Sequence, residues 1–143
     1  MNKAAILTIS STRTLQDDVS GSLIEDIVTD DKDKIREQLL FLCDELKPDI
    51  IFSVGGTGLG PHDFTPEATV SIIDRSVPGL SELIRSSGQE KTRRAMLSRG
   101  ISGVRGSTLI INLPGSPKGA GESLEAITDL LPHAVEMLKG GGH

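Results

Sequence analysis

Two runs of β-branched and aliphatic residues, each followed directly by a loop with little side-chain bulk, constrain this chain most. The first run covers residues 50–54 and opens into 55–58; the second covers residues 109–113 and opens into 114–118. Each run is predicted to be a buried strand, and a segment that can form a helix follows each loop. In an α/β protein, the backbone N–H groups of such a loop and the N-terminus of the next helix converge on a phosphate. Two such loops predict a site that holds two phosphate-bearing groups side by side.

Strand and helix patterns alternate along the chain. The predicted strands are residues 4–10, 49–54 and 107–113. The predicted helices are residues 32–46, a helix beginning at Pro66, residues 78–87 and 90–97, and a C-terminal helix that Pro132 kinks or splits, with Leu124, Ile127, Leu131, Val135 and Leu138 on one face. This alternation favours a three-layer αβα arrangement of the α/β class, with a mostly parallel sheet and helices on both faces. With 143 residues, the chain is expected to form one domain over residues 1–143.

Three of these helices have recognisable starts. Asp30 or Asp31 is predicted to cap the first helix. Thr65 is predicted to cap the helix that begins at Pro66, and Ser116 the helix whose first residue is Pro117. The apolar face of the first helix is expected to carry Ile35, Leu39, Leu42, Cys43 and Leu46.

One stretch is too short for this pattern. After Gly21, a doubly wound fold needs a helix and a second strand, but only residues 22–29 precede the acidic pair Asp30 and Asp31. A parallel crossover alone takes roughly a dozen residues. Either the chain is shortened between about Gly21 and Asp30, or residues of the molecule are missing from the sequence there. We favour the second explanation because the flanking segments are intact.

Composition narrows the functional class. The formal net charge is −5 and the 15 basic residues form no tract, which argues against a nucleic-acid partner. There is no Trp or Tyr to stack on bases, and no apolar run reaches the roughly 20 residues of a membrane span. The single cysteine permits no internal disulfide, and the start of the chain has no signal-peptide pattern, so a cytoplasmic location is expected. Histidine and cysteine lack the spacing of a structural zinc site.

The first glycine loop and the aspartate that follows it form the first half of the candidate site. The predicted phosphate-binding residues of this loop are Gly55, Gly56, Thr57 and Gly58. A tight turn that needs positive φ explains the same glycines without any ligand. If Thr65 supplies the helix cap, the Asp63 carboxylate is free to bind Mg²⁺ or to orient a nucleophile; otherwise Asp63 only stabilises the helix N-terminus.

Further polar residues follow the other strands. The candidates for a second anion-binding turn are Pro114, Gly115, Ser116 and Lys118. Ser11 and Thr12 follow the first strand, and Ser98 precedes Arg99, whose guanidinium can bind a phosphate in bidentate fashion. Each set also has a purely structural explanation, as a strand-to-helix turn, a closed turn or a surface pair.

Together these segments resemble the molybdopterin-binding proteins of molybdenum cofactor biosynthesis. Within that family they resemble the molybdopterin adenylyltransferases, which include bacterial Mog proteins and the G domains of plant and animal cofactor-insertion proteins. The resemblance rests on residues 55–58 with Asp63, and on residues 65–69, 78–80, 95–99 and 109–118. It covers nearly the whole chain except the stretch after Gly21. The motifs are specific only jointly, in this order and spacing.

The resemblance implies a three-layer α/β domain, usually a homotrimer, that transfers AMP from ATP to the terminal phosphate of molybdopterin and releases pyrophosphate. It implies that the first glycine loop contacts nucleotide and pterin and that the 114–117 turn helps to hold the pterin phosphate. It also associates Asp63 and Asp30 with activity, and these carboxylates would place Mg²⁺. A molybdenum-insertion protein is the implied partner. Such a transfer needs little covalent chemistry from the protein, because aligning two polyanions and screening their repulsion is enough.

A few residues depart from the adenylyltransferase pattern. Thr12 stands where many relatives carry aspartate, and Phe64 stands where a smaller apolar residue is common. Residues 6–8 and 17–21 are more similar to the sister group, the MoaB-type molybdopterin-binding proteins. The alternative function is therefore molybdopterin binding without adenylylation. A third alternative is a nucleotide-binding regulator that has no affinity for the pterin.

Overall fold

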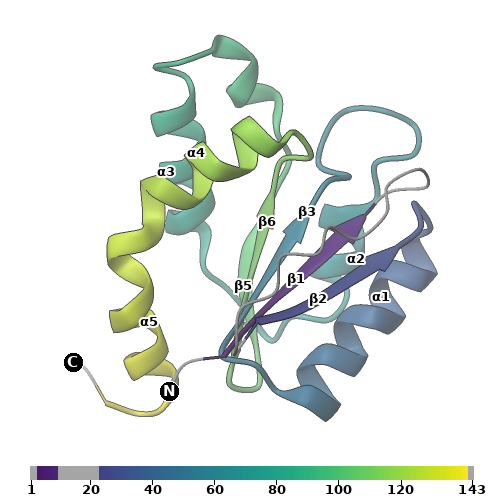
Figure 1. The fold of residues 1–143 in the computed structure, drawn as a ribbon, viewed down its shortest axis with the longest axis vertical. Helices are drawn as coiled ribbons and strands as arrows, with labels where there is room; N and C mark the ends of the chain where they lie inside the picture. The colour runs from purple at the N-terminus through teal and green to yellow at the C-terminus, as the bar shows by residue number, and fades with distance from the viewer. Residues whose placement is uncertain (1–2, 10–22, 142–143) are drawn as a thin grey trace.

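The computed structural model describes residues 3–9 and 23–141, which form a six-stranded sheet between two layers of helices (Figure 1). The strands are β1 (Ala4–Ile9), β2 (Leu23–Val28), β3 (Ile50–Val54), β4 (Arg75–Ser76), β5 (Ser102–Arg105) and β6 (Thr108–Leu113), in the spatial order β2-β1-β3-β6-β5-β4. The first four strands of that order are parallel, whereas β5 runs antiparallel to β6 and β4 antiparallel to β5. The predicted α/β class and mostly parallel sheet are confirmed.

The central strands are buried on both faces and mostly apolar, because helices cover both faces. The helices are α1 (Lys32–Phe41) and α2 (Thr65–Val70) on one side, and α3 (Pro78–Gly88), α4 (Pro117–Ile127) and α5 (Leu131–Leu138) on the other. Successive side chains of a strand point to opposite faces. Ile51 and Ile110 accordingly pack in the cluster that contains α1 and α2, while their neighbours Phe52 and Ile111 pack in the cluster of α3, α4 and α5.

The first helix begins as predicted and ends differently. Asp31 is its N-cap: Oδ1 accepts hydrogen bonds from the backbone N–H groups of Asp33 and Lys34, at 2.9 and 3.1 Å. After Phe41 the chain continues as one π-helical turn, Leu42–Leu46. The predicted apolar face is buried except for Leu46, which is 42% exposed. The prediction for Leu46 was wrong because the wider π turn moves this residue off the α-helical face.

Strand β2 occupies the stretch that the sequence pattern finds too short. It pairs in parallel with β1 from Ala4 opposite Leu23 to Ile9 opposite Val28, and α1 follows it almost at once. The second strand, which the sequence pattern finds missing from this stretch, is therefore present. The segment that joins β1 to β2, residues 10–22, lies outside the described residues, so the prediction that residues are missing from the sequence stays a prediction.

The far edge of the sheet was not predicted. Strands β4 and β5 are only two and four residues long and contain Arg75, Ser102 and Gly103, so they have no apolar alternation. The helix predicted over residues 90–97 is a shorter 3₁₀ turn, η2 (Arg93–Leu97), with Thr92 as its N-cap. The C-terminal helix is split as expected: η3 (Thr128–Leu130) separates α4 from α5, and Pro132 lies in the first turn of α5.

Candidate active site

The first glycine loop leaves β3 through two residues with positive φ, Gly55 at 107° and Gly56 at 71°. Thr65 is not the cap predicted from the sequence, because it is the first residue of α2, and the N-cap Phe64 has no capping side-chain hydrogen bond. The Thr65 hydroxyl instead donates to the carbonyl of Gly55, at 2.8 Å. A Cβ at Gly56 would overlap that hydroxyl. Glycine is thus required here by the turn and by the close approach of α2.

The two predicted loops lie against each other at the carboxyl ends of neighbouring strands. The N–H group of Gly55 donates to the carbonyl of Leu113 at 3.0 Å, and a Cβ on Gly115 would lie 3.3 Å from Gly55 Cα. This apposition follows from the sheet order, since β3 and β6 pair in parallel. Ligands of open α/β sheets bind in such crevices outside the carboxyl ends of the strands.

Arg99 fixes the first loop in place. Its backbone N–H donates to the carbonyl of Thr57, its Nε to that of Gly58 and its Nη2 to that of Asp63, each at 2.8 Å. Its Nη1 lies 2.6 Å from Glu67 Oε2. That hydrogen bond from Arg99 holds the pKa of the Glu67 carboxyl below its usual range. The arginine is not among the residues that line the cavity described below.

Asp63 follows the first glycine loop and forms a hydrogen bond within the same segment. Its Oδ2 accepts a hydrogen bond from the backbone N–H of Gly60 at 2.9 Å, and the carboxylate lines the cavity. Within the part of the chain that the structure describes, Oδ1 has no hydrogen-bond donor. One carboxylate together with substrate phosphates and water suits the coordination of Mg²⁺, so Asp63 fits the role of a metal ligand. Residues 3–9 and 23–141 contain no group of three or more His, Cys, Asp or Glu that could hold a metal ion.

The second loop presents a capped helix N-terminus. Ser116 is the N-cap of α4, its Oγ accepts from the Gly119 N–H at 3.0 Å, and Pro117 is the first helical residue, as predicted. Ser116 and Gly119 both line the cavity, whereas the exposed Lys118 does not. The positive end of the α4 dipole therefore faces this space.

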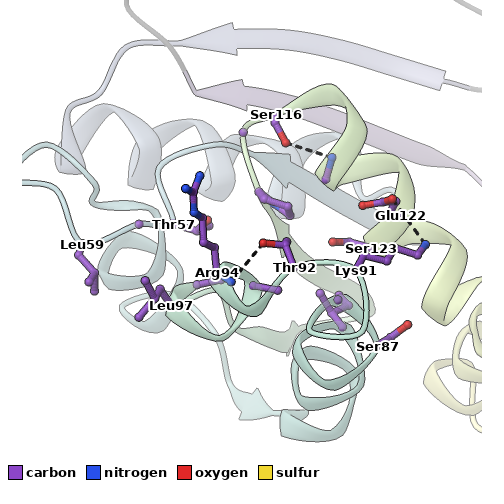
Figure 2. Close-up of a pocket in the computed structure, with 18 of the residues that line it drawn as sticks. Thr57, Leu59, Ser87, Lys91, Thr92, Arg94, Leu97, Ser116, Glu122 and Ser123 are labelled. Carbon is purple, nitrogen blue, oxygen red and sulfur yellow. Dashed lines mark hydrogen bonds and ion pairs between the residues drawn. The ribbon is translucent and has the colours of Figure 1, made fainter.

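A cavity of about 640 Å³ lies between these loops and the segment that joins α3 to η2 (Figure 2). The predicted residues that line it are Gly56, Thr57, Gly58, Asp63, Ser98, Pro114, Gly115 and Ser116. Gly55 and Arg99 support the first loop without lining the cavity. Asp30 follows β2, two strands away from β3, and does not line it either. Ser11 and Thr12 lie outside the described residues.

The residues of one wall of the cavity were not predicted from the sequence. The side chains that it overlooked are Leu59, Ile84, Ser87, Lys91, Thr92, Arg94, Ala95, Leu97, Glu122 and Ser123. Most of them belong to α3, α4 and η2, whereas the expectation that ligands bind at the carboxyl ends of strands points only to residues that follow strands. Lys91, Arg93 and Arg94 lie close together in the sequence, and this basic cluster was the available indication of the missed wall.

The sequence of the chain is similar to those of known proteins. Residues 7–133 match the family described as "Probable molybdopterin binding domain". The chain is 41% identical over 115 residues to the molybdopterin adenylyltransferase of Helicobacter pylori, and 32% identical over 126 residues to that of Escherichia coli K12. In both cases the match covers 80% of this chain and 65% of the relative, so the chain spans just under two thirds of the length of these proteins.

Solved structures agree with the fold. The molybdopterin biosynthesis enzyme MoaB from Thermus thermophilus has a TM-score of 0.87 and 45% identity, with 98% of each chain covered. The molybdopterin biosynthesis Mog protein from Mycobacterium ulcerans also has a TM-score of 0.87, at 34% identity, with 96% of this chain and 99% of that chain covered. The chain therefore belongs to the molybdopterin-binding domain family, as its motifs indicated. No helix in the described part of the chain is long and apolar enough to span a membrane.

Proposed function

We propose that this protein is a molybdopterin adenylyltransferase. The observation that carries the proposal is the apposition of two loops, 55–58 and 114–116, that are predicted to bind anions and that both contribute residues to one cavity with Asp63. A transfer between two phosphate-bearing substrates needs both of them in one space and in line. Relatives at 41% and 32% identity that are named molybdopterin adenylyltransferase support the same assignment.

In the proposed reaction, an oxygen of the terminal phosphate of molybdopterin attacks the α-phosphorus of ATP. The bond between the α-phosphorus and the bridging oxygen breaks, and pyrophosphate leaves with that electron pair. The products are adenylyl-molybdopterin and pyrophosphate. The chain contributes orientation and charge: backbone N–H groups at Gly56, Thr57 and Gly58, the start of α4 at Ser116, and the hydroxyl of Ser98 are the proposed donors to phosphate oxygens.

Asp63 is the proposed ligand of Mg²⁺, which when bound neutralises charge that develops on the phosphates. The Gly60 N–H orients its carboxylate through Oδ2. Asp30 was predicted as a second metal ligand and Lys118 as a phosphate contact. We retain both roles as proposals for the enzyme with its substrates bound. Ser11 and Thr12 remain proposed nucleotide contacts. For Arg99 we propose a positioning role, because its guanidinium already binds two carbonyl groups and Glu67.

The alternative is a MoaB-type protein that binds molybdopterin without adenylylating it. The 45% identity to the Thermus MoaB structure supports this alternative. An assay with purified protein, molybdopterin, ATP and Mg²⁺ separates the two. Pyrophosphate release that depends on molybdopterin would support the transferase, and pterin binding with no pyrophosphate would support the alternative.

We infer a single cytoplasmic domain that assembles as a homotrimer and passes its product to a molybdenum-insertion protein. Exposed apolar side chains at the rim of the cavity, Leu59 at 68% and Leu97 at 57% exposure, support an assembly that covers them. Neither a nucleic acid nor a membrane surface is a proposed partner of this acidic chain.

A further inference from the structure

The charged side chains that line the cavity differ in whether they have a hydrogen-bond or ion-pair partner. Those that line it are Asp63, Lys91, Arg94 and Glu122. Lys91 Nζ lies 3.6 Å from Glu122 Oε2, and Asp63 accepts the hydrogen bond from Gly60. The guanidinium of Arg94 has neither a hydrogen-bond acceptor nor a carboxylate partner among the described residues.

The backbone that carries Arg94 is nevertheless well fixed. The N–H of Thr92 donates to the carbonyl of Gly88 at 3.0 Å, and the N–H of Ala95 donates to that of Thr92 at 3.1 Å. The N–H of Arg94 itself donates to the hydroxyl of Thr92, at 3.3 Å. Figure 2 shows the Arg94 side chain extending from η2 on the side away from the Lys91 and Glu122 pair. A fixed backbone thus presents an uncommitted cation to the cavity.

A phosphate bound near the wall formed by α3 and η2 needs a positively charged side chain such as Arg94. The C-terminal end of α3 lines the wall at Gly88, and the carboxyl end of a helix carries partial negative charge. Asp63 adds a full negative charge to the same cavity, and Lys91 is partly neutralised by Glu122. Arginine binds phosphate strongly because two of its N–H groups match two phosphate oxygens.

We propose that Arg94 is a phosphate-binding residue of this cavity, which forms a bidentate contact with a phosphate group of one of the two substrates. The proposal deepens the proposed function and rests on it, since it concerns the same site. The shared chemistry is a terminal phosphate or a diphosphate, carried by the nucleotide or by the pterin. The neighbouring Arg93 is a matched control, because it is exposed like Arg94 but does not line the cavity.

The test is calorimetric binding of pyrophosphate, ATP and molybdopterin to the intact protein and to R94Q, R94K and R93Q at one fixed ionic strength. R94Q is expected to weaken at least one of these ligands about tenfold or more, with partial recovery in R94K and a change of at most about twofold in R93Q. Weakening of pyrophosphate and ATP assigns the contact to the nucleotide, and weakening of molybdopterin alone assigns it to the pterin phosphate. Melting temperatures of the variants show whether the fold is kept.

Equal losses in R94Q and R93Q would overturn the proposal, because they would reflect net charge and not a contact. Unchanged binding in R94Q, or no binding of any phosphate ligand by the unmodified protein, would also overturn it. Failure of the proposed function is a separate result: phosphate ligands would bind in an Arg94-dependent way, but no adenylylated pterin would form.

Discussion

Arg99 and Glu67 join the first glycine loop to the first turn of α2 through an ion pair in which Nη1 and Oε2 are 2.6 Å apart. The same guanidinium holds the carbonyls of Gly58 and Asp63. The loop from Gly58 to Asp63 is thus tied to Arg99 at both of its ends. The residue that most directly sets the position of Asp63 therefore lies outside the cavity.

Loss of Arg99 should reduce activity more than stability. In Arg99→Gln, the loop that presents Asp63 loses its charged hydrogen bonds from the guanidinium, and small displacements of catalytic groups reduce turnover by tenfold to roughly a hundredfold. The ion pair is a third or more exposed, so we expect unfolding free energy to fall by only about 1 kcal/mol. Turnover and thermal unfolding of the same variant check this. A normal turnover number would show that Arg99 has no positioning role in catalysis.

The same pair should make stability sensitive to acid. Glu67 has a lowered pKa in the folded protein, so the pair contributes stability above the unfolded pKa of about 4.3 and loses it as the pH falls through the lower folded value. The difference in melting temperature between the unmodified protein and Glu67→Gln should therefore be largest above about pH 5 and should shrink towards pH 3. Asp44, which Arg105 shifts in the same direction, is present in both proteins and cancels. A constant difference over this range would contradict the role of the charge.

Asp63→Asn should separate catalysis from binding. Asparagine keeps an oxygen that can accept from Gly60 but removes the negative charge proposed to bind Mg²⁺. Turnover should fall about a hundredfold or more, which corresponds to about 2.7 kcal/mol in activation free energy. Molybdopterin affinity and melting temperature should change little. If turnover persists while stability drops, Asp63 has only a structural role.

Glycine is required at Gly56 and not at Gly79. Gly56→Ala places a Cβ on a residue with φ of 71° and against the Thr65 hydroxyl, so we expect a loss of about 2 kcal/mol or more in stability together with lower activity. Gly79, the second residue of α3, has open space at its Cβ position, so Gly79→Ala should be neutral or stabilise by up to about 1 kcal/mol. Chemical denaturation of both variants tests the contrast. Similar losses in both would argue against a specific clash.

We expect the protein to be a homotrimer in solution. Sedimentation at tens of micromolar should give a mass near three times 15.2 kDa, because a specific interface of ordinary size associates at roughly micromolar concentration. A single species of 15.2 kDa would contradict the homotrimer.

The parts of the fold with a strong local pattern could be predicted from the sequence. Strands β3 and β6 are mostly apolar and buried on both faces, and Asp31, Ser116 and Pro117 mark helix starts through local hydrogen bonds and fixed φ. These features depend on neighbouring residues, which the sequence shows. The two glycine loops were predicted together because parallel strands end at the same edge of a sheet.

The features that were missed depend on distant contacts. Thr65 donates to Gly55, ten residues away, and the preference of threonine for helix caps does not reveal this. Arg99 contacts Glu67, from which it is separated by 32 positions in the sequence. Arg94 and Lys91 reach the cavity only because α3 and α4 pack side by side on one face of the sheet. Such tertiary placement has no periodic signature in the sequence.

The fate of the α-phosphate of ATP distinguishes adenylyl transfer from pterin binding alone. Purified protein is incubated with molybdopterin, Mg²⁺ and ATP that carries a label on the α-phosphorus, and in a parallel sample with ATP labelled on the γ-phosphorus. If the protein is an adenylyltransferase, the α-label moves to the pterin product, one per molybdopterin consumed, and the γ-label leaves entirely as pyrophosphate. Label that stays in ATP in both samples, while molybdopterin remains bound to the protein, would contradict adenylyl transfer and leave a pterin-binding protein.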